Sequence, residues 1–199
     1  MIHLVAKEVL RQYQCKSFIE TGTFEGDTLA LVESWMPELP HLKSLYGVDL
    51  WDKAIEMTQK RVKHTQLFED NSVNWLKTFV PQMESPAFYF LDAHTFGWLP
   101  AEQQEISNSY SPNNQLYIQE LEILMKSSGP FVICIDDWNA EYNLSQSKHL
   151  IDHVWVTTSN SPTVCDINGN VRGIGRPSCY FVKGLDETIL RDLELQREE

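Results

Sequence analysis

The sequence predicts an α/β protein with a doubly wound, mainly parallel seven-stranded sheet, helices on both faces and a C-terminal antiparallel hairpin. Strand-like and helix-like segments alternate five times, which is typical of parallel sheets built from strand–helix–strand units. Residues 87–92 and 131–137 are continuous apolar runs, as expected for strands that are buried on both faces. Each of the first five strands also ends in an acidic residue or an acidic cluster. In such sheets, ligands bind beyond the carboxyl ends of the strands.

Local signals place the individual elements. Apolar residues at helical spacing predict an N-terminal helix within residues 1–14, and Pro37 and Pro81 end two later helices because proline cannot continue a helix. Asn168 and Gly169 form a turn signal before the last strand. The expected strands are residues 17–20, 45–50, 65–68, 87–92, 131–137, 154–158 and 179–182. The other expected helices are residues 27–35, 52–62, 73–80, 116–125 and 147–152. The charged tail, residues 186–199, is expected to form a frayed helix.

Length and composition restrict the class of protein. The chain has 199 residues, 42% of them hydrophobic, which suits a single domain spanning residues 1–199. The formal net charge of −12 argues against nucleic acid or an anionic membrane as the partner, so we expect a small molecule. The four cysteines show no C-x-x-C spacing, and the N-terminus resembles neither a signal peptide nor a membrane span, which favours a cytoplasmic protein with reduced thiols. The oligomeric state is left open, a homodimer included.

The stretch FIETGTFEGDT, residues 18–28, reads as a strand end, a ligand loop and a helix start. Glu20 would end the strand and face a ligand cation. Gly22 would allow a sharp turn or the close approach of a ligand, and Gly26 would let the next helix pack tightly. Thr23 lies in the same loop and is a further candidate for ligand binding. The alternative is a purely structural turn of an α/β protein.

The spacing E-x-G-x-x-x-G differs from the dinucleotide-binding pattern G-x-G-x-x-G. Glu25 and Asp27 place negative charge beside the loop, which would repel a pyrophosphate. A ligand with a cation and a short carboxylate fits better. The stretch resembles motif I of the class I S-adenosylmethionine-dependent methyltransferases, and the resemblance implies that the loop binds the methionine end of S-adenosylmethionine.

Acidic residues after the second and third strands are candidates for the rest of such a ligand. Asp49 is placed to accept hydrogen bonds from ribose hydroxyls, as an acidic residue does in dinucleotide-binding folds, although it could instead cap the next helix. Asp70, Asn71 and Ser72 open the following helix and could receive an adenine amino group. For Asp70, a simple helix cap is the alternative.

The fourth and fifth strands end in a second polar cluster. Asp92, Asp136 and Asp137 supply hard oxygen ligands, which suit Mg²⁺, Mn²⁺ or Ca²⁺ better than zinc. A bound divalent ion would lower the pKa of a substrate hydroxyl, and His94 could take its proton. The alternative is that no metal binds and that His94 only hydrogen-bonds a carboxylate to hold its loop.

The resemblance extends over about residues 15–140. The segments L-D-x-H at residues 91–94 and I-D-D at residues 135–137 look like those of a group of class I methyltransferase-like proteins that also carry E-T-G-T-x-x-G-D-T. Residues 118–121, IQEL, are likewise similar to that group. The resemblance implies a Rossmann-like methyltransferase fold, with Asp92 also near the cofactor. By similarity to metal-dependent O-methyltransferases of the catechol and macrolide-sugar kinds, the candidate metal ligands and base are Asp92, Asp136, Asp137 and His94. The sequence departs from the pattern because no substrate-domain insertion is present and Asn139 matches no ligand.

The function expected from these signals is S-adenosylmethionine-dependent methylation, most simply of an oxygen of a small molecule or sugar, with a divalent metal as a further expected part. Two alternatives stay open: a non-catalytic binding module that keeps the fold, and a metal-dependent hydrolase that uses the same carboxylates. The acceptor itself is not encoded in any motif, because loops such as residues 95–114 would build its pocket.

Overall fold

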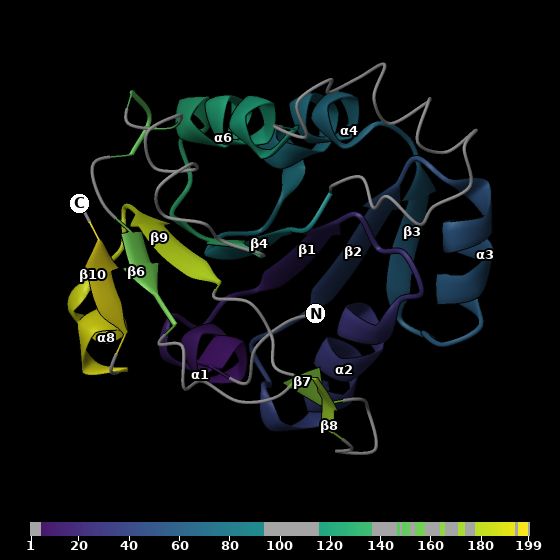
Figure 1. Ribbon diagram of the computed structural model, residues 1–199, viewed down its shortest axis with the longest axis horizontal. Coiled ribbons are helices and arrows are strands. Elements are labelled where there is room, and N and C mark those ends of the chain that lie inside the picture. The colour runs from purple at the N-terminus through teal and green to yellow at the C-terminus, as the bar shows by residue number, and fades with distance from the viewer. Residues whose placement is uncertain are drawn as a thin grey trace.

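An eight-stranded sheet forms the centre of the computed structural model, with strand order β10-β6-β9-β5-β4-β1-β2-β3 (Figure 1). The structure describes residues 5–93, 116–136, 147, 149–151, 154–157, 164–165, 171–173, 178–193 and 195–198. The strands of this sheet are β1 (Ser17–Thr21), β2 (Ser44–Asp49), β3 (Thr65–Glu69), β4 (Ala87–Leu91), β5 (Phe131–Ile135), β6 (Val154–Val156), β9 (Cys179–Lys183) and β10 (Gln196–Glu198). The strands β7 (Val164–Cys165) and β8 (Val171–Gly173) form a separate antiparallel pair.

The helices connect these strands. The α-helices are α1 (Val5–Gln12), α2 (Asp27–Trp35), α3 (Asp52–Gln59), α4 (Ser72–Phe79), α6 (Leu116–Lys126) and α8 (Thr188–Asp192), and short 3₁₀ helices lie at η1 (Met36–Glu38) and η2 (Val80–Gln82). Pro37 and Pro81 lie in these two 3₁₀ turns, directly after α2 and α4. The expected helix ends are thus confirmed, since proline removes the amide that the next helical turn would need. Among the described helices, none has the length and hydrophobicity that crossing a bilayer requires.

The strand directions agree with the predicted fold. Strands β3, β2, β1, β4 and β5 are parallel, and β9 runs antiparallel to both β5 and β6. The predicted sheet and its C-terminal antiparallel pair are therefore confirmed. The tail differs from the expected helix: α8 covers only five residues, and β10 then pairs with β6. This pairing gives hydrogen-bond partners to the backbone of β6, which would otherwise form the edge of the sheet.

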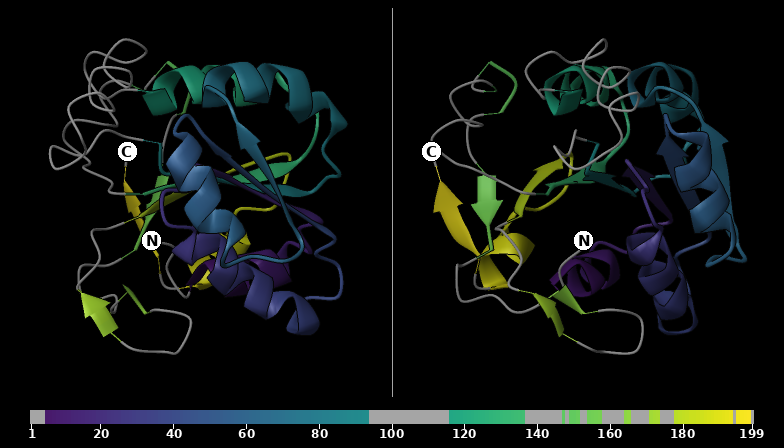
Figure 2. Two further views of the ribbon diagram at one scale, coloured as in Figure 1. Left: turned by 90° about the vertical axis from the view of Figure 1, so that its right-hand side faces the viewer. Right: turned by 45° about the vertical axis from the view of Figure 1, so that its right-hand side comes forward.

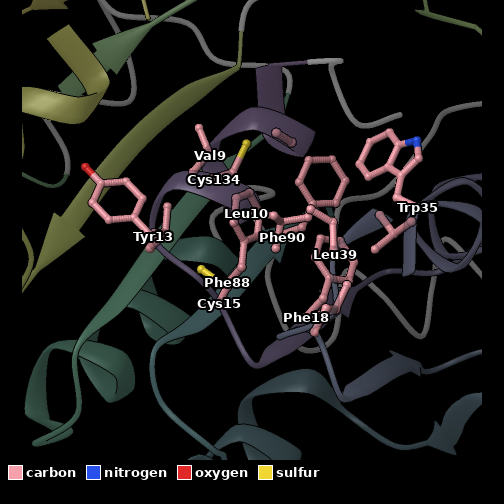
Figure 3. Packing of buried hydrophobic residues seen from close by; sticks show 14 of the residues in the cluster. Val9, Leu10, Tyr13, Cys15, Phe18, Trp35, Leu39, Phe88, Phe90 and Cys134 are labelled. Atoms are coloured by element: carbon pink, nitrogen blue, oxygen red, sulfur yellow. The ribbon is translucent and has the colours of Figure 1, made fainter. Parts of the chain in front are cut away.

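Two apolar layers bury the two faces of the sheet. The helices lie on both sides of the sheet (Figures 1 and 2). Helices α1 and α2 cover one face, and α4 and α6 cover the other. Figure 3 shows part of the first layer, in which Val9 and Leu10 of α1 meet the sheet residues Phe18, Phe88 and Phe90. The rings of Phe18 and Phe88 stack with centroids 5.4 Å apart. Because successive strand residues face opposite layers, β4 and β5 are apolar throughout, as the sequence pattern indicated.

Candidate functional site

The carboxyl ends of the central strands lie in one row, because the parallel strands pair in register. Backbone hydrogen bonds continue the sheet one residue beyond the strand ends: the amide of Asp92 donates to Thr21 O (3.0 Å), and that of Asp136 donates to Leu91 O (3.1 Å). The residues of this row are Asp49, Gly22, Asp92 and Asp136. The structure therefore brings together predicted site residues that are more than one hundred positions apart in the sequence.

The loop from β1 to α2 is held by two glycines with left-handed backbones. Gly22 has φ +79°, and a Cβ built on it would lie 2.7 Å from both Ala93 Cα and Asp92 O. Gly26 has φ +77°, and a Cβ there would lie 2.7 Å from the Thr58 side chain of α3. Both glycines are therefore required by the close approach of other parts of the chain. For Gly22, the sharp turn is confirmed, and the atoms nearest to it belong to the end of β4.

Thr23 and Glu20 are closed off from solvent on either side of Gly22. Thr23 is 4% exposed, and its Oγ1 accepts a hydrogen bond from Thr58 Oγ1 at 3.4 Å. Glu20 is 2% exposed, and its Oε2 has no hydrogen-bond partner among the described residues. Burial raises the pKa of Glu20 well above its ordinary value, and the negative charge of Asp92 raises it further. The predicted contact between Glu20 and a ligand cation stays a prediction.

Asp49 fastens the loop to the end of β2. Its Oδ2 accepts a hydrogen bond from Phe24 N (3.0 Å), and its Oδ1 accepts one from Trp51 N (2.9 Å). Burial raises the pKa of Asp49, and these backbone hydrogen bonds oppose the rise. The rings of Phe24 and Trp51 stack with centroids 6.4 Å apart. Since each carboxylate oxygen has two lone pairs, Asp49 can hold the loop and still accept ribose hydroxyls.

Among the residues after β3, Asn71 and not Asp70 is the cap of the next helix, and their predicted contact with adenine stays a prediction. Asn71 caps α4: its side-chain oxygen accepts hydrogen bonds from Val73 N (3.0 Å) and Asn74 N (3.2 Å). Asp70, for which a cap was the alternative, is exposed and accepts a hydrogen bond from Asn71 N. Ser72 is buried at the first position of α4. The cap belongs to Asn71 because a capping oxygen must reach the second and third amides of the helix.

Asp92 and Asp136 are half-buried at neighbouring positions of the row. Asp136 Oδ1 accepts a hydrogen bond from Ser178 Oγ at 2.7 Å, and the amide of Ser178 donates to Thr157 Oγ1 at 2.9 Å. Ser178 directly precedes β9, and no sequence signal pointed to it. His94 and Asp137 lie outside the described residues.

The predicted metal site includes Asp137, which lies outside the described residues. Within the described ranges, no group of three His, Cys, Asp or Glu side chains could hold a metal ion. Asp92 and Asp136 supply carboxylate oxygens of the kind that Mg²⁺, Mn²⁺ and Ca²⁺ prefer, but they make only two of the three expected ligands. The three-carboxylate site with Asp137 therefore stays a prediction.

Arg61, which follows α3, changes the charge beside the loop. Its guanidinium pairs with Asp27 and, at 3.2 Å, with Glu25 Oε2. The sequence suggested that Glu25 and Asp27 would repel an anionic ligand. Because Arg61 offsets part of their charge, the structure makes this exclusion weaker than expected.

Glu120 is a buried acid near the site residues Thr21, Ser72 and Asp92, and the sequence analysis gave it no role. It lies on α6, is 0% exposed and has no hydrogen-bond partner for either carboxyl oxygen among the described residues. Burial raises the pKa of Glu120 to about 7, the charge of Asp92 adds to the rise, and the nearby hydroxyls of Ser72 and Thr21 oppose it. The signal was present, since Glu120 lies one turn before the buried Leu124, on the helix face that an acid normally avoids.

Comparison with solved structures finds proteins that are similar to this chain. The apo structure of CmcI-N160 is 14% identical, with a TM-score of 0.50 over 88% of this chain and 68% of that chain. An rRNA methylase from Streptococcus thermophilus is 13% identical, with a TM-score of 0.49 over 94% of this chain and 99% of that chain. An S-adenosylmethionine-dependent methyltransferase from Anabaena variabilis ATCC 29413 is 13% identical, with a TM-score of 0.49 over 90% and 80%.

The likeness to CmcI shows the fold alone, because the identity is low. Together with the strand order, it confirms the doubly wound, Rossmann-like sheet that the sequence predicted. No protein-family model matches the chain, and no curated protein matches it. The activity is therefore argued from the site.

Proposed function

We propose that this protein is an S-adenosylmethionine-dependent methyltransferase that acts on an oxygen of a small molecule or sugar. The observation that carries the proposal is the preformed loop between β1 and α2. Gly22 presses this loop against the end of β4, and Asp49 holds the amide of Phe24 from the end of β2. A loop fixed in this way crosses the carboxyl edge of the sheet, where ligands of doubly wound folds bind.

The charges of the site fit a cationic ligand. The negative charges of Asp92 and Asp49 both raise the pKa of Glu20, so each of them repels a negative charge on Glu20. A sulfonium and an ammonium group would relieve this repulsion. Bound S-adenosylmethionine would supply both charges together with an activated methyl group.

Each part of the proposed cofactor has candidate binding residues. Glu20, Gly22, Thr23 and Gly26 would hold the methionine part. Asp49 would accept the ribose hydroxyls with the lone pairs that the loop leaves unused. Asp70, Asn71 and Ser72 would surround the adenine at the start of α4. The exposure of Asp70 supports its proposed contact with the adenine amino group, because its carboxylate is accessible.

The acceptor side of the proposal rests on Asp92 and Asp136, which directly follow the neighbouring strands β4 and β5. Alignment of the acceptor oxygen with the methyl group would supply most of the rate, assisted by removal of the acceptor proton. Asp92 would orient the acceptor, and His94 would act as the base. As a further part of the proposal, Asp92, Asp136 and Asp137 would hold Mg²⁺, Mn²⁺ or Ca²⁺. The net charge of −12 supports a small-molecule acceptor rather than nucleic acid or a membrane, and we place the protein in the cytoplasm.

Calorimetric titration with S-adenosylmethionine and with its demethylated product tests the cofactor part. The wild-type protein should bind both saturably. Asp49→Asn should weaken binding by about tenfold or more, because hydrogen bonds to a charged group contribute about 1.5–3 kcal/mol. Asp52→Asn, the same change at an exposed position at the start of α3, is the matched control and should bind like the wild type. A wild-type protein that binds neither compound overturns the proposal.

Metal and turnover measurements separate the proposal from its alternatives. Methyl transfer to catechol-like and sugar acceptors should require a divalent ion, and Asp92→Asn should abolish it. Saturable cofactor binding with no transfer to any acceptor would favour the non-catalytic module. Metal binding that Asp92→Asn removes, without any thermal stabilisation by S-adenosylmethionine, would favour the hydrolase.

A further inference from the structure

Three buried polar side chains from three separate elements converge beneath the loop of the proposed cofactor site. They are Thr21 at the end of β1, Ser72 at the start of α4 and Glu120 on α6. Their exposed fractions are 0%, 5% and 0%. Within the described part of the chain, Thr21 Oγ1, Ser72 Oγ and both carboxyl oxygens of Glu120 have no hydrogen-bond partner.

These oxygens lie close to one another. The hydroxyls of Ser72 and Thr21 are near enough to Glu120 to lower the pKa of its carboxyl, although neither has the geometry of a formed hydrogen bond. A carboxylate can accept from two hydroxyls, so small side-chain rotations would give all four oxygens a partner. The two hydroxyls can thus supply the hydrogen bonds that the carboxylate of Glu120 needs, without any additional group.

As long as these hydrogen bonds are not formed, the buried carboxyl of Glu120 lowers the stability of the fold. Glutamate is almost never fully buried unless it is paired, and a buried polar atom without a partner carries its full desolvation cost. An apolar side chain of similar volume would pack between α4 and α6 without that cost. A stability cost of this kind is typical of residues that serve a functional site.

The cluster of Thr21, Ser72 and Glu120 lies next to the loop between β1 and α2. Thr21 directly precedes Gly22, and Ser72 follows the Asn71 cap of α4. Helices α4 and α6 pack side by side over this face of the sheet (Figure 1). The carboxyl of Glu120 is also close enough to feel the charge of Asp92. One acid on α6 is therefore in reach of the two elements that would hold the methionine and adenine parts of the cofactor.

We propose that Glu120 is a positioning residue of the cofactor site: its carboxyl closes hydrogen bonds to Thr21 and Ser72 and thereby sets the loop after β1 and the start of α4 for the cofactor. The inference rests on the proposed function, and it adds a residue that acts through two others. In this role Glu120 contributes to cofactor binding and not to stability.

Replacement of the acid tests this directly. Glu120→Met keeps the approximate volume and removes the polar group, so its thermal midpoint at neutral pH should equal or exceed that of the wild type. Its affinity for the demethylated product of S-adenosylmethionine should fall by about tenfold or more, the effect of losing hydrogen bonds to a charged group. Glu120→Gln, which keeps the shape and one acceptor oxygen, should recover part of the affinity. Glu122→Gln, a change of the same kind at a partly exposed position of the same helix, is the matched control and should change neither quantity.

The route through Thr21 is tested by combining changes. Thr21→Val should weaken binding in the wild type and cause no further loss in the Glu120→Met protein, because Thr21 is proposed to act only through Glu120. Equal affinity of Glu120→Met and the wild type overturns the inference and leaves the proposed function intact. A lower thermal midpoint with unchanged affinity also overturns it, since Glu120 would then be purely structural. A wild-type protein that does not bind the product overturns the proposed function and, with it, this inference.

Discussion

Substitution of Gly22 by alanine tests how the loop is held to the sheet. The φ of +79° costs an alanine about 1–2 kcal/mol relative to glycine. The new Cβ would also lie 2.7 Å from Ala93 Cα and from Asp92 O. Both are backbone atoms at the end of β4, so no side-chain rotation can relieve the contact. Overpacking of this kind costs a further ~1–3 kcal/mol, and the expected total loss of unfolding free energy is about 2–5 kcal/mol.

Gly184→Ala is the matched control for the backbone term. Gly184 has φ +66°, and Pro130 Cα would lie 3.5 Å from a Cβ added there, which is an ordinary van der Waals contact. The Gly184→Ala protein should therefore lose only about 1–2 kcal/mol of unfolding free energy, which is the cost of the left-handed backbone for alanine. Equilibrium urea denaturation of the three proteins, followed by tryptophan fluorescence, measures both losses. If Gly22→Ala loses no more stability than Gly184→Ala, the loop is not pressed against β4, and the main support for the proposed function is removed.

Three further predictions concern single side chains. Burial raises the pKa of Glu120 to about 7 from 4.5, so the stability associated with its protonated form is complete below pH 4.5 and is lost as the pH rises to about 7. At about 1.4 kcal/mol per pH unit, the unfolding free energy of Glu120→Gln should therefore rise by about 3 kcal/mol relative to that of the wild type between pH 4.5 and pH 7. If urea denaturation gives the same difference between the two proteins at both pH values, the raised pKa of Glu120 is wrong. Ser178→Ala removes the 2.7 Å hydrogen bond to Asp136 and should lower the unfolding free energy by about 1–3 kcal/mol; an unchanged urea midpoint would show that the bond contributes nothing. Asn71→Ala should cost about 1 kcal/mol through loss of the α4 cap, and Asn71→Asp should cost less because aspartate also caps; equal losses in thermal unfolding would refute the capping role.

The strands and their order of alternation with helices could be predicted because both follow from local patterns. The apolar runs at residues 87–92 and 131–137 suit only strands that are covered on both faces, and β4 and β5 occupy the centre of the sheet. Pro37 and Pro81 marked the helix ends because the effect of proline acts on its own turn. The β10 strand was missed, since its pairing partner β6 lies about forty residues away.

For the site, the sequence predicted positions better than roles. Glu20, Asp49, Asp92 and Asp136 were expected at strand ends, and the register of the parallel strands confirms that they share one edge of the sheet. The sequence did not show that Glu20 would be 2% exposed, or that Asp49 would bind the amide of Phe24. These facts depend on which side chains other elements place beside each acid.

The sequence by itself therefore determined the fold class and the edge where the acids gather, because periodicity, turn residues and strand ends are properties of neighbouring positions. Only the tertiary structure decided which acids are buried, which are hydrogen-bonded and which are offset by a cation. Ser178 meets Asp136 across 42 positions, Arg61 meets Asp27 across 34, and Glu120 lies beside Thr21 from a different helix altogether. Burial and pairing set the charge of a carboxyl, and both are properties of its spatial neighbours, which no local pattern records.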